Sequence, residues 1–385
     1  MSVRTSERRL ALLVAEYRYF QSHRLGLARA AVQRGYRVHV LTRVPEDRAL
    51  QGEPGMEIVN VPMVRSLRPC ADMRLAAELT RQLRRIKPDI VHNVSVKLAL
   101  LGSLCALRVG VPAILNAYTG LGYVFRADGA GPWLIRKLAQ PVLAWITRRP
   151  GCWAVFQNDD DRECFRRLGL LAEARTELIP GSGVDTDDFA PAPEPEGVPV
   201  VAFVGRLIRD KGIGEFVAAA ERLSGRGARA RFVAVGEADE HNPRSVDEGT
   251  IQAWRKRNVV EWWGYRPDMD DVYRKVHVVC LPSHHEGLPK VLLEGAASGR
   301  PLVATDIAGC RLVVRDGVNG FLVPKGNPEQ LADALEKLIL NKELRVKMGA
   351  EGRRIVERRF RADLINGQIL DLYERMTTTR RGGGQ

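Results

Sequence analysis

The chain has 385 residues, which is long for one hydrophobic core and sufficient for two domains. Hydrophobic residues make up 45% of it, yet no stretch approaches the roughly 18 apolar residues that span a bilayer, so a membrane bundle is excluded. The formal net charge is +13, and residues 1–190 carry 28 Lys and Arg against 19 Asp and Glu. A basic N-terminal half attracts a polyanion, whether nucleic acid, acidic lipid or a phosphorylated substrate.

The six cysteines form no C-x-x-C pair, and their spacing suits neither a zinc site nor a disulfide framework. The apolar run at residues 10–15 is too short for a signal peptide, and Glu16 ends it. We therefore expect a cytoplasmic protein whose cysteines stay reduced.

Short strand-like runs alternate with amphipathic helical segments through the first 180 residues. This alternation predicts a parallel sheet with helices on both faces. The expected strands are 10–15, 36–42, 87–93 and 111–117, and the expected helices are 24–34, 72–86 and 98–109.

The segment PAPEPEG, residues 191–197, has three prolines and favours an extended linker. Beyond it the alternation restarts. We expect strands at 198–205, 231–236, 276–282 and 301–305, and a helix at 211–223. The predicted organisation is an N-terminal Rossmann-like domain (1–190), the linker (191–197), a second such domain (198–355), and a C-terminal helix with a frayed tail (356–385). The fold class is α/β, with two doubly wound domains facing across a cleft.

The stretch VAFVGRLIRDKGIGEF, residues 201–216, places Arg206 after a buried strand and Lys211 near the start of the next helix. Glycine at 205, 212 and 214 allows close backbone approach. Two cations beside a helix N-terminus suit a diphosphate, because they neutralise its charge. The alternative is an ordinary turn with solvated charges.

The stretch EGLPKVLLEGAASGRPLVATD begins at Glu286, and a second acid, Glu294, follows eight residues later. Pro289 favours a helix start, so Glu286 is expected in a loop and Glu294 on the helix. A carboxylate can accept hydrogen bonds from two hydroxyls, which suits sugar diols. Alternatively, Glu286 is a helix-dipole partner and Glu294 a solvated helix residue.

With these motifs and DGVNGFLVP (316–324), the whole chain resembles the family-4 retaining glycosyltransferases of the GT-B fold. The resemblance implies a metal-independent hexosyltransferase that needs no cofactor and takes a nucleotide diphosphate sugar, UDP-linked by expectation, as co-substrate. It implies catalytic roles for Glu286, Arg206 and Lys211. The donor-binding residues that it implies are Glu294, Gly205, Gly287, Leu288 and Pro289.

The N-terminal stretches FQSHRLGLARAAVQRGYRVHVLT, VHNVSVKLALLGSLCA and ILNAYTGLGYVF are similar to bacterial transferases that extend sugars on undecaprenyl diphosphate. This narrower resemblance implies a lipid-linked saccharide acceptor and a role in O-antigen, capsule or glycoprotein glycan assembly. Many family members carry a His near the position of Tyr118, so Tyr118 or Thr119 is a candidate to replace it or to line the wall.

Further acceptor-binding candidates are Gly120 and Gly122, whose backbone N–H groups suit a diphosphate, and His23 with Arg24 in the first strand-to-helix loop. Alternatively, Gly120 and Gly122 belong to a flexible loop, and His23 and Arg24 form a turn at the start of a helix. Residues 133–149 mix Trp, Leu and Ile with Arg and Lys, a composition typical of a membrane interface or of a basic surface over an apolar core. The expected location is the inner face of the cell membrane.

Metal and nucleic-acid binding are weaker hypotheses. The acidic runs at 158–165 and 184–189 contain D-x-D spacing, but helix capping and a turn explain them. His284 and His285 are adjacent and lack a third ligand. The basic residues show no aromatic interleaving typical of nucleic-acid binding. A sugar-nucleotide epimerase on the same fold and a transferase with a soluble acceptor remain as alternatives.

Overall fold

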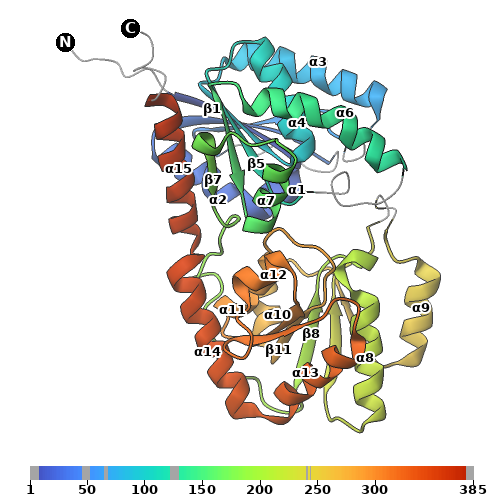
Figure 1. The fold of residues 1–385 in the computed structure, drawn as a ribbon. Helices are drawn as coiled ribbons and strands as arrows, with labels where there is room; N and C mark the ends of the chain where they lie inside the picture. Colours follow the sequence, from blue (N-terminus) through green and yellow to red (C-terminus); the bar gives the residue numbers. More distant parts are fainter. Residues whose placement is uncertain are drawn as a thin grey trace. The chain divides into compact units, whose positions relative to one another are not determined.

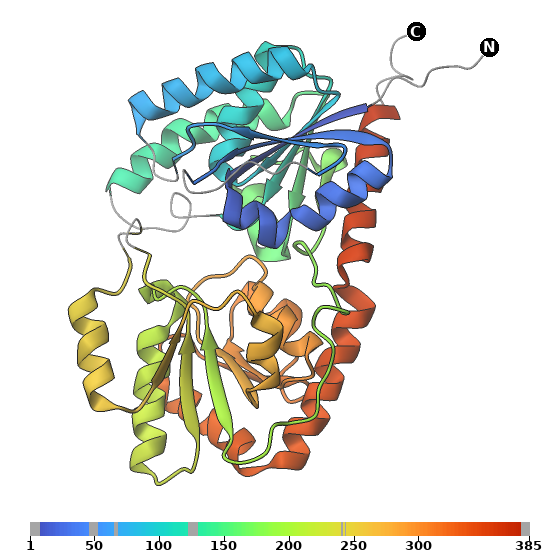
Figure 2. The ribbon, with the colours of Figure 1, turned by 180° about the vertical axis from the view of Figure 1, so that it is seen from behind.

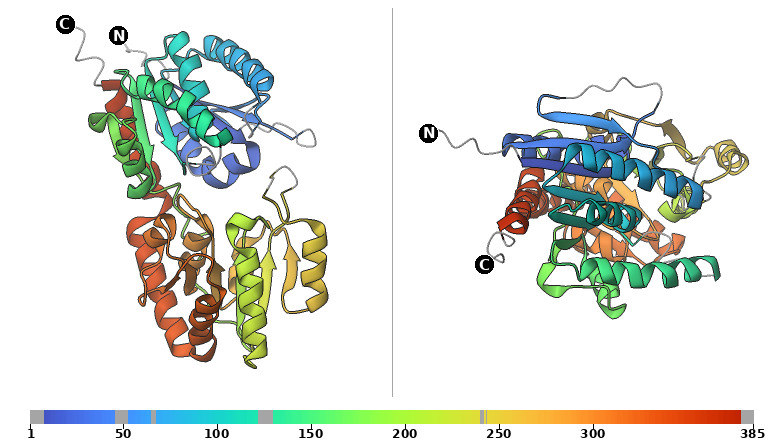
Figure 3. Two further views of the ribbon diagram at one scale, coloured as in Figure 1. Left: turned by 45° about the vertical axis from the view of Figure 1, so that its right-hand side comes forward. Right: turned by 90° about the horizontal axis from the view of Figure 1, so that it is seen from above.

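The computed structural model describes residues 8–45, 53–64, 68–121, 130–239, 242 and 244–378. By its internal contacts the chain divides into two compact units. The first comprises Met1–Ser182 with Asp363–Gln385, and the second comprises Gly183–Ala362. Each unit contains one parallel sheet covered by helices, as the ribbon views show (Figures 1, 2 and 3).

The first unit is built on a seven-stranded parallel sheet in the order β3-β2-β1-β4-β5-β6-β7. Successive residues of β1 point to opposite faces, and Leu10 to Leu13 are all fully buried. A strand that is apolar on both faces requires helices on both, which the sequence predicts correctly. The strands are β1 (Arg8–Glu16), β2 (Tyr36–Arg43), β3 (Met56–Asn60), β4 (Ile90–Val94), β5 (Ala113–Tyr118), β6 (Cys152–Phe156) and β7 (Thr176–Leu178).

The helices of the first unit form two layers. One core joins Leu10 and Leu12 to α1, α2 and α15, and another joins Ala11 and Leu13 to α3, α4 and α6. The C-terminal helix thus packs on the first sheet. The helices are α1 (Tyr17–His23), α2 (Leu25–Gln33), α3 (Pro69–Ile86), α4 (Val96–Arg108), α6 (Ala130–Thr147), α7 (Asp159–Arg167) and α15 (Ala362–Thr378), with the 3-10 turn η1 (Glu173–Arg175).

None of the helices in the described part of the chain is both long enough and apolar enough to cross a lipid bilayer.

The second unit repeats this architecture with six parallel strands in the order β10-β9-β8-β11-β12-β13. The chain starts at the centre with β8, builds outward to one edge, and then returns to place β11 on the other side of β8. Ligands of such sheets bind at the carboxyl ends of the strands where the order reverses, here between β8 and β11. The strands are β8 (Val200–Val204), β9 (Arg231–Val235), β10 (Glu261–Gly264), β11 (Val278–Leu281), β12 (Leu302–Thr305) and β13 (Gly320–Val323).

Helices also cover both faces of the second sheet. Val201 and Phe203 of β8 pack toward α8 and α13, whereas Val200, Ala202 and Val204 pack toward α10, α11, α12 and α14. The helices are α8 (Ile213–Gly225), α9 (Glu248–Arg257), α10 (Met269–Arg274), α11 (Lys290–Ala297), α12 (Ala308–Val313), α13 (Pro328–Leu340) and α14 (Lys342–Arg359), with the 3-10 turn η2 (Arg209–Lys211).

The proline-rich segment 191–197 belongs to the second unit by its contacts, although the sequence suggested a linker. The Glu194 carboxylate pairs with the Arg345 guanidinium at 2.7 Å, and both side chains are more than 90% buried. The carbonyl of Pro193 accepts from Arg300, and that of Pro195 accepts from His277. The division between the units falls earlier, between Ser182 and Gly183.

The segments that begin and end the second unit are hydrogen-bonded to each other. The Val184 N–H donates to the Phe360 carbonyl at 2.9 Å, and the Ala362 N–H donates to the Val184 carbonyl at 3.0 Å. A Cβ on Gly183 would lie 2.8 Å from the Phe360 carbonyl oxygen, so this close approach requires glycine. The two points where the chain passes between units are therefore held together.

We predict that Glu194→Gln lowers the free energy of unfolding of the second unit by roughly 3 kcal/mol, because the charge of Arg345 stays buried without its carboxylate. Urea titration measures the change. Glu196→Gln is the matched control, since Glu196 is exposed and its loss is expected to change stability by less than about 0.5 kcal/mol. Equal midpoints for the two variants would show that the segment is not anchored by this pair.

Candidate functional site

The loop that follows β8 packs tightly against the loop that follows β11. Gly212 is the N-cap of α8 with a φ of 75°, and a Cβ there would lie 2.0 Å from the Pro282 carbonyl oxygen. The Ser283 hydroxyl and the His284 N–H both donate to the Asp210 carbonyl, at 3.0 and 2.8 Å. The loops after β8 and β11 therefore pack against and hydrogen-bond to each other at the point where the strand order of the second sheet reverses.

Lys211 and Glu286 form an ion pair across these two loops. The Lys211 Nζ lies 2.5 Å from the Glu286 Oε1, and the Glu286 side chain is only 9% exposed. Lys211 ends the short turn η2, just before α8, and Glu286 lies in the loop between β11 and α11. Two residues that are 75 positions apart in the sequence thus meet at the carboxyl edge of the sheet, as their strand-end positions predict.

Arg206 lies on the other side of the same edge and pairs with Asp239, which follows β9, at 2.5 Å. The β8 and β9 loops touch here, since a Cβ on Gly236 would lie 2.0 Å from the Gly205 carbonyl oxygen. The Arg206 side chain is 45% exposed, so it remains accessible to an anionic ligand. Gly205 itself has a φ of 153°, a backbone conformation that favours glycine.

Glu294 is held on α11 by two side chains. The Tyr273 hydroxyl donates to its Oε2 at 3.0 Å, and the Lys290 Nζ lies 3.2 Å from its Oε1. Burial, reinforced by the negative charge of Glu294, raises the pKa of Tyr273 well above its usual value, so the hydroxyl stays protonated and donates. The carboxylate of Glu294 is therefore fixed in direction.

Packing fixes the loop between Glu286 and the start of α11. Pro289 is the N-cap of α11, and the partly buried Leu288 packs on the core of the second unit. A Cβ on Gly309, in the first turn of α12, would lie 2.6 to 2.7 Å from the carbonyl oxygens of Glu286 and Gly287. The loop that carries Glu286 is thus packed against α12.

In the part of the chain that the structure describes, neither His284 nor His285 belongs to a cluster of potential metal ligands. His284 Nε2 lies 2.6 Å from the Glu215 carboxylate. No group of three His, Cys, Asp or Glu side chains suited to a metal ion occurs among the residues that the structure describes.

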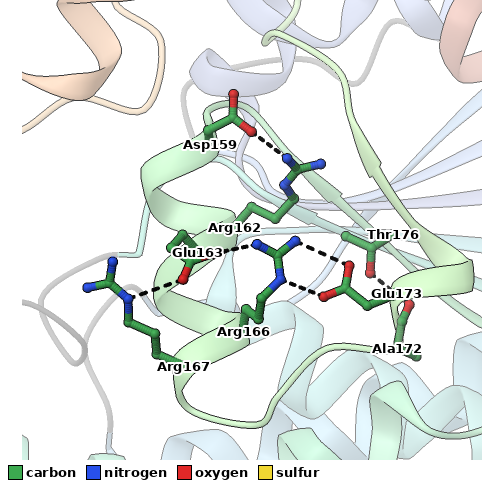
Figure 4. Close-up of polar contacts among 8 residues, drawn as sticks. All are labelled: Asp159, Arg162, Glu163, Arg166, Arg167, Ala172, Glu173 and Thr176. Atoms are coloured by element: carbon green, nitrogen blue, oxygen red, sulfur yellow. Dashed lines mark hydrogen bonds and ion pairs between the residues drawn. The ribbon is translucent and has the colours of Figure 1, made fainter.

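The acidic run at 158–165 comprises the N-cap and most of α7, and its side chains form a series of exposed ion pairs (Figure 4). Asn158 accepts from the Asp161 N–H at 2.8 Å and so caps the helix. Arg166 contacts Glu163 one turn away and Glu173 beyond the helix. In the second run, Asp185 accepts from the Asp187 N–H in a turn. Capping and turn formation account for both runs, as the sequence suggested.

The first-unit candidates are dispersed. His23 ends α1, where its ring stacks on Tyr19 and its Nδ1 lies 2.7 Å from the Ser22 hydroxyl. Arg24 is buried. The pKa of the fully buried His92 is lowered well below its usual value, mainly by burial and further by the positive charge of Arg24. Arg24 therefore lies in the interior, and its contact with an acceptor phosphate stays a prediction.

Tyr118 also points into the core. Its ring stacks on Phe156 at 4.8 Å and contacts Phe165, and the side chain is fully buried. Burial raises the pKa of Tyr118, so its hydroxyl stays protonated. The end of β5 turns the Tyr118 side chain toward α6 and α7, and the contact of Tyr118 with an acceptor stays a prediction. Thr119 and Gly120 are half-buried, and Gly122 lies outside the described residues.

Sequence reasoning missed Asp239, Tyr273, Lys290 and Gly309. Asp239 and Gly309 follow strands that were correctly expected to end at this edge. Their positions just after strand ends could therefore have identified them as site candidates. Tyr273 and Lys290 act on Glu294 from two different helices, and only the fold brings Tyr273 near.

Comparisons with known proteins assign the two units to one group. Residues 21–188 match the family described as Glycosyltransferase Family 4, and residues 184–355 match Glycosyl transferases group 1. The fold resembles that of sucrose-phosphate synthase from Thermosynechococcus elongatus, with a TM-score of 0.81 and 21% identity over 97% of this chain and 100% of that one.

Two curated relatives cover most of the chain. The UDP-Gal:alpha-D-GlcNAc-diphosphoundecaprenol alpha-1,3-galactosyltransferase of Escherichia coli is 27% identical over 83% of both chains. The D-inositol 3-phosphate glycosyltransferase of Xylanimonas cellulosilytica is 29% identical over 92% of this chain and 91% of that one. With the family matches spanning residues 21–355, the chain belongs to the group 1 glycosyltransferases of family 4, which have the GT-B fold, use a nucleotide sugar and retain the anomeric configuration.

Proposed function

We propose that this glycosyltransferase moves a hexose or N-acetylhexosamine from a UDP-sugar to a saccharide carried on undecaprenyl diphosphate, in the assembly of a surface polysaccharide or a glycoprotein glycan. The Lys211–Glu286 ion pair is the observation that supports the donor half of the proposal. Arg206 lies in the loop after β8, and Glu294 lies on α11, the helix after β11.

Each of these four side chains has a chemical role in the proposal. Lys211 and Arg206 neutralise the diphosphate, Glu286 accepts from hydroxyls of the transferred sugar, and Glu294 accepts from the ribose hydroxyls. Gly205, Gly287, Leu288 and Pro289 shape the loops around the donor through their backbone. A fixed cation beside a developing negative charge needs no reorganisation when the bond breaks, which is the main electrostatic contribution to such reactions.

The proposed step exchanges one bond for another. The bond between the anomeric carbon and the β-phosphate oxygen breaks, and an acceptor hydroxyl oxygen attacks from the same face. The new bond joins this oxygen to the anomeric carbon, and the acceptor proton passes to the departing diphosphate, so no separate base is required. Lys211 and Arg206 stabilise the departing charge.

The lipid-linked acceptor rests on the similarity to the Escherichia coli enzyme, whose name specifies a diphosphoundecaprenol substrate. The basic N-terminal half, which carries most of the net charge, also suits a diphosphate-bearing acceptor. The enzyme would then act at the cytoplasmic face of the cell membrane. A soluble acceptor is the second candidate, because the comparably similar Xylanimonas cellulosilytica enzyme is named for D-inositol 3-phosphate.

The direct test has two stages. A panel of nucleotide sugars is first screened for thermal stabilisation, since a ligand at 100 times its Kd adds about 2.7 kcal/mol. The stabilising donor is then offered to undecaprenyl-diphosphate-linked saccharides and to free phosphorylated polyols. Transfer to the lipid-linked saccharide supports the proposal, and transfer only to a soluble acceptor contradicts it. Conversion of the donor alone would indicate an epimerase.

We predict that Arg206→Ala or Lys211→Ala lowers kcat by about 100-fold or more, the scale for losing one charge contact in the transition state. Single-turnover kinetics with saturating donor measures this loss. Arg209→Ala is the matched control, because Arg209 lies in the same loop with an exposed side chain and is expected to keep near wild-type turnover. Near wild-type turnover in both test variants would refute the role of the cations. Arg206 is exposed, so its loss leaves the fold intact.

We predict that Tyr273→Phe raises the KM for the donor about 10-fold and leaves kcat nearly unchanged. Loss of a hydrogen bond to a charged group costs about 1.5 kcal/mol, and the ribose that Glu294 would bind is remote from the reacting bond. Initial-rate kinetics with varied donor separates the two constants. The exposed Tyr265→Phe is the control. A fall in kcat at constant KM would place Glu294 at the reaction centre instead.

A further inference from the structure

Helix α6 exposes a stripe of large apolar side chains. Trp133, Leu134, Leu138 and Trp145 are 51%, 53%, 66% and 44% exposed, respectively. Leu134, Leu138 and Trp145 are separated by four and seven residues, so they lie on one face of the helix. The exposed Pro141 falls on the same face, three residues beyond Leu138. The outward surface of α6 is thus a continuous apolar strip.

The opposite face of α6 is apolar as well. Leu143 and Ile146 are fully buried in the cores beneath the helix, which lies beside α4 (Figure 1). A helix that is apolar on both faces is normally covered on both. In the described part of the chain, however, the outer face of α6 remains open to solvent. An uncovered strip of this kind marks an interaction surface.

Cations flank the strip, and α6 contains no acidic residue. The Lys137 ammonium lies 6.0 Å from the Trp133 ring, and the Arg149 guanidinium lies 4.0 Å from the Trp145 ring. Arg148 is also exposed at the end of the helix. Aliphatic and Trp side chains between Lys and Arg are typical of helices that lie in the plane of a membrane interface.

We propose that α6 docks the enzyme on an anionic lipid surface. Leu134, Leu138 and Trp145 enter the boundary between headgroups and acyl chains, while Lys137, Arg148 and Arg149 meet the lipid phosphates. The charge of the helix selects this occupant, because a strip with only positive residues along it is complementary to an anionic bilayer. This inference deepens the proposed function by naming the element that would bring the enzyme to a lipid-linked acceptor.

The test is co-sedimentation of the full chain with vesicles, without donor or acceptor. Vesicles of phosphatidylcholine with 30% phosphatidylglycerol are compared with pure phosphatidylcholine. The wild type is expected to bind the anionic vesicles at least about 10-fold more tightly, since three cations contribute near the surface. Binding that is equal on both vesicle types, or absent from both, would overturn the proposal.

Two double variants separate the apolar and charged parts. Leu134→Gln/Leu138→Gln is expected to weaken binding to anionic vesicles by about 10-fold or more, because both side chains leave water on docking. Lys137→Gln/Arg148→Gln is expected to weaken binding on the anionic vesicles and to reduce its salt dependence. Wild-type affinity in either variant would contradict the assignment to α6.

The matched control is Leu340→Gln/Val346→Gln, which removes two exposed apolar side chains from the second unit and is expected to bind vesicles like the wild type. Stabilisation by UDP is measured in every variant and should be unchanged, so a failure to bind lipid is distinguished from a failure of the donor site. Self-association in solution that Leu134→Gln/Leu138→Gln abolishes would assign the strip to a second copy of the chain.

Discussion

The Lys211–Glu286 ion pair is the interaction on which the proposed donor site depends. It ties the loop after β8 to the loop after β11, where the order of the second sheet reverses. Around the pair, the Gly212 and Pro282 backbones are in close contact, and two hydrogen bonds end on the Asp210 carbonyl. A cation and a carboxylate held this rigidly are preorganised for a ligand that carries both phosphate and hydroxyl groups.

Parallel-sheet topology explains why these residues meet. The carboxyl ends of β8, β9 and β11 lie at one edge of the sheet, so Arg206 meets Asp239 there, and Lys211 meets Glu286, although the partners are far apart in the chain. Glu294 belongs to the helix after β11, and Tyr273 reaches it from α10. The fold thus brings these charged side chains to one edge of the sheet, and their hydrogen-bond and ion-pair partners fix the directions in which they point.

The fold class, and the placement of Glu286 in a loop and Glu294 on a helix, could be predicted from the sequence because strand ends and helix starts have local signatures. The orientation of Tyr118 and Arg24 could not. All six residues of β5 are buried, so no alternation of polarity indicates which face Tyr118 takes. Proline content likewise predicts that residues 191–197 are extended, but the buried Glu194–Arg345 pair, which attaches them to the second unit, joins positions 151 residues apart.

The most direct test of this account is a crystal structure of the enzyme with a bound UDP-sugar. The account requires diphosphate oxygens within hydrogen-bonding distance of the Lys211 Nζ and the Arg206 guanidinium, and ribose hydroxyls donating to the Glu294 carboxylate. A nucleotide bound elsewhere, or a diphosphate that contacts neither cation, would contradict it.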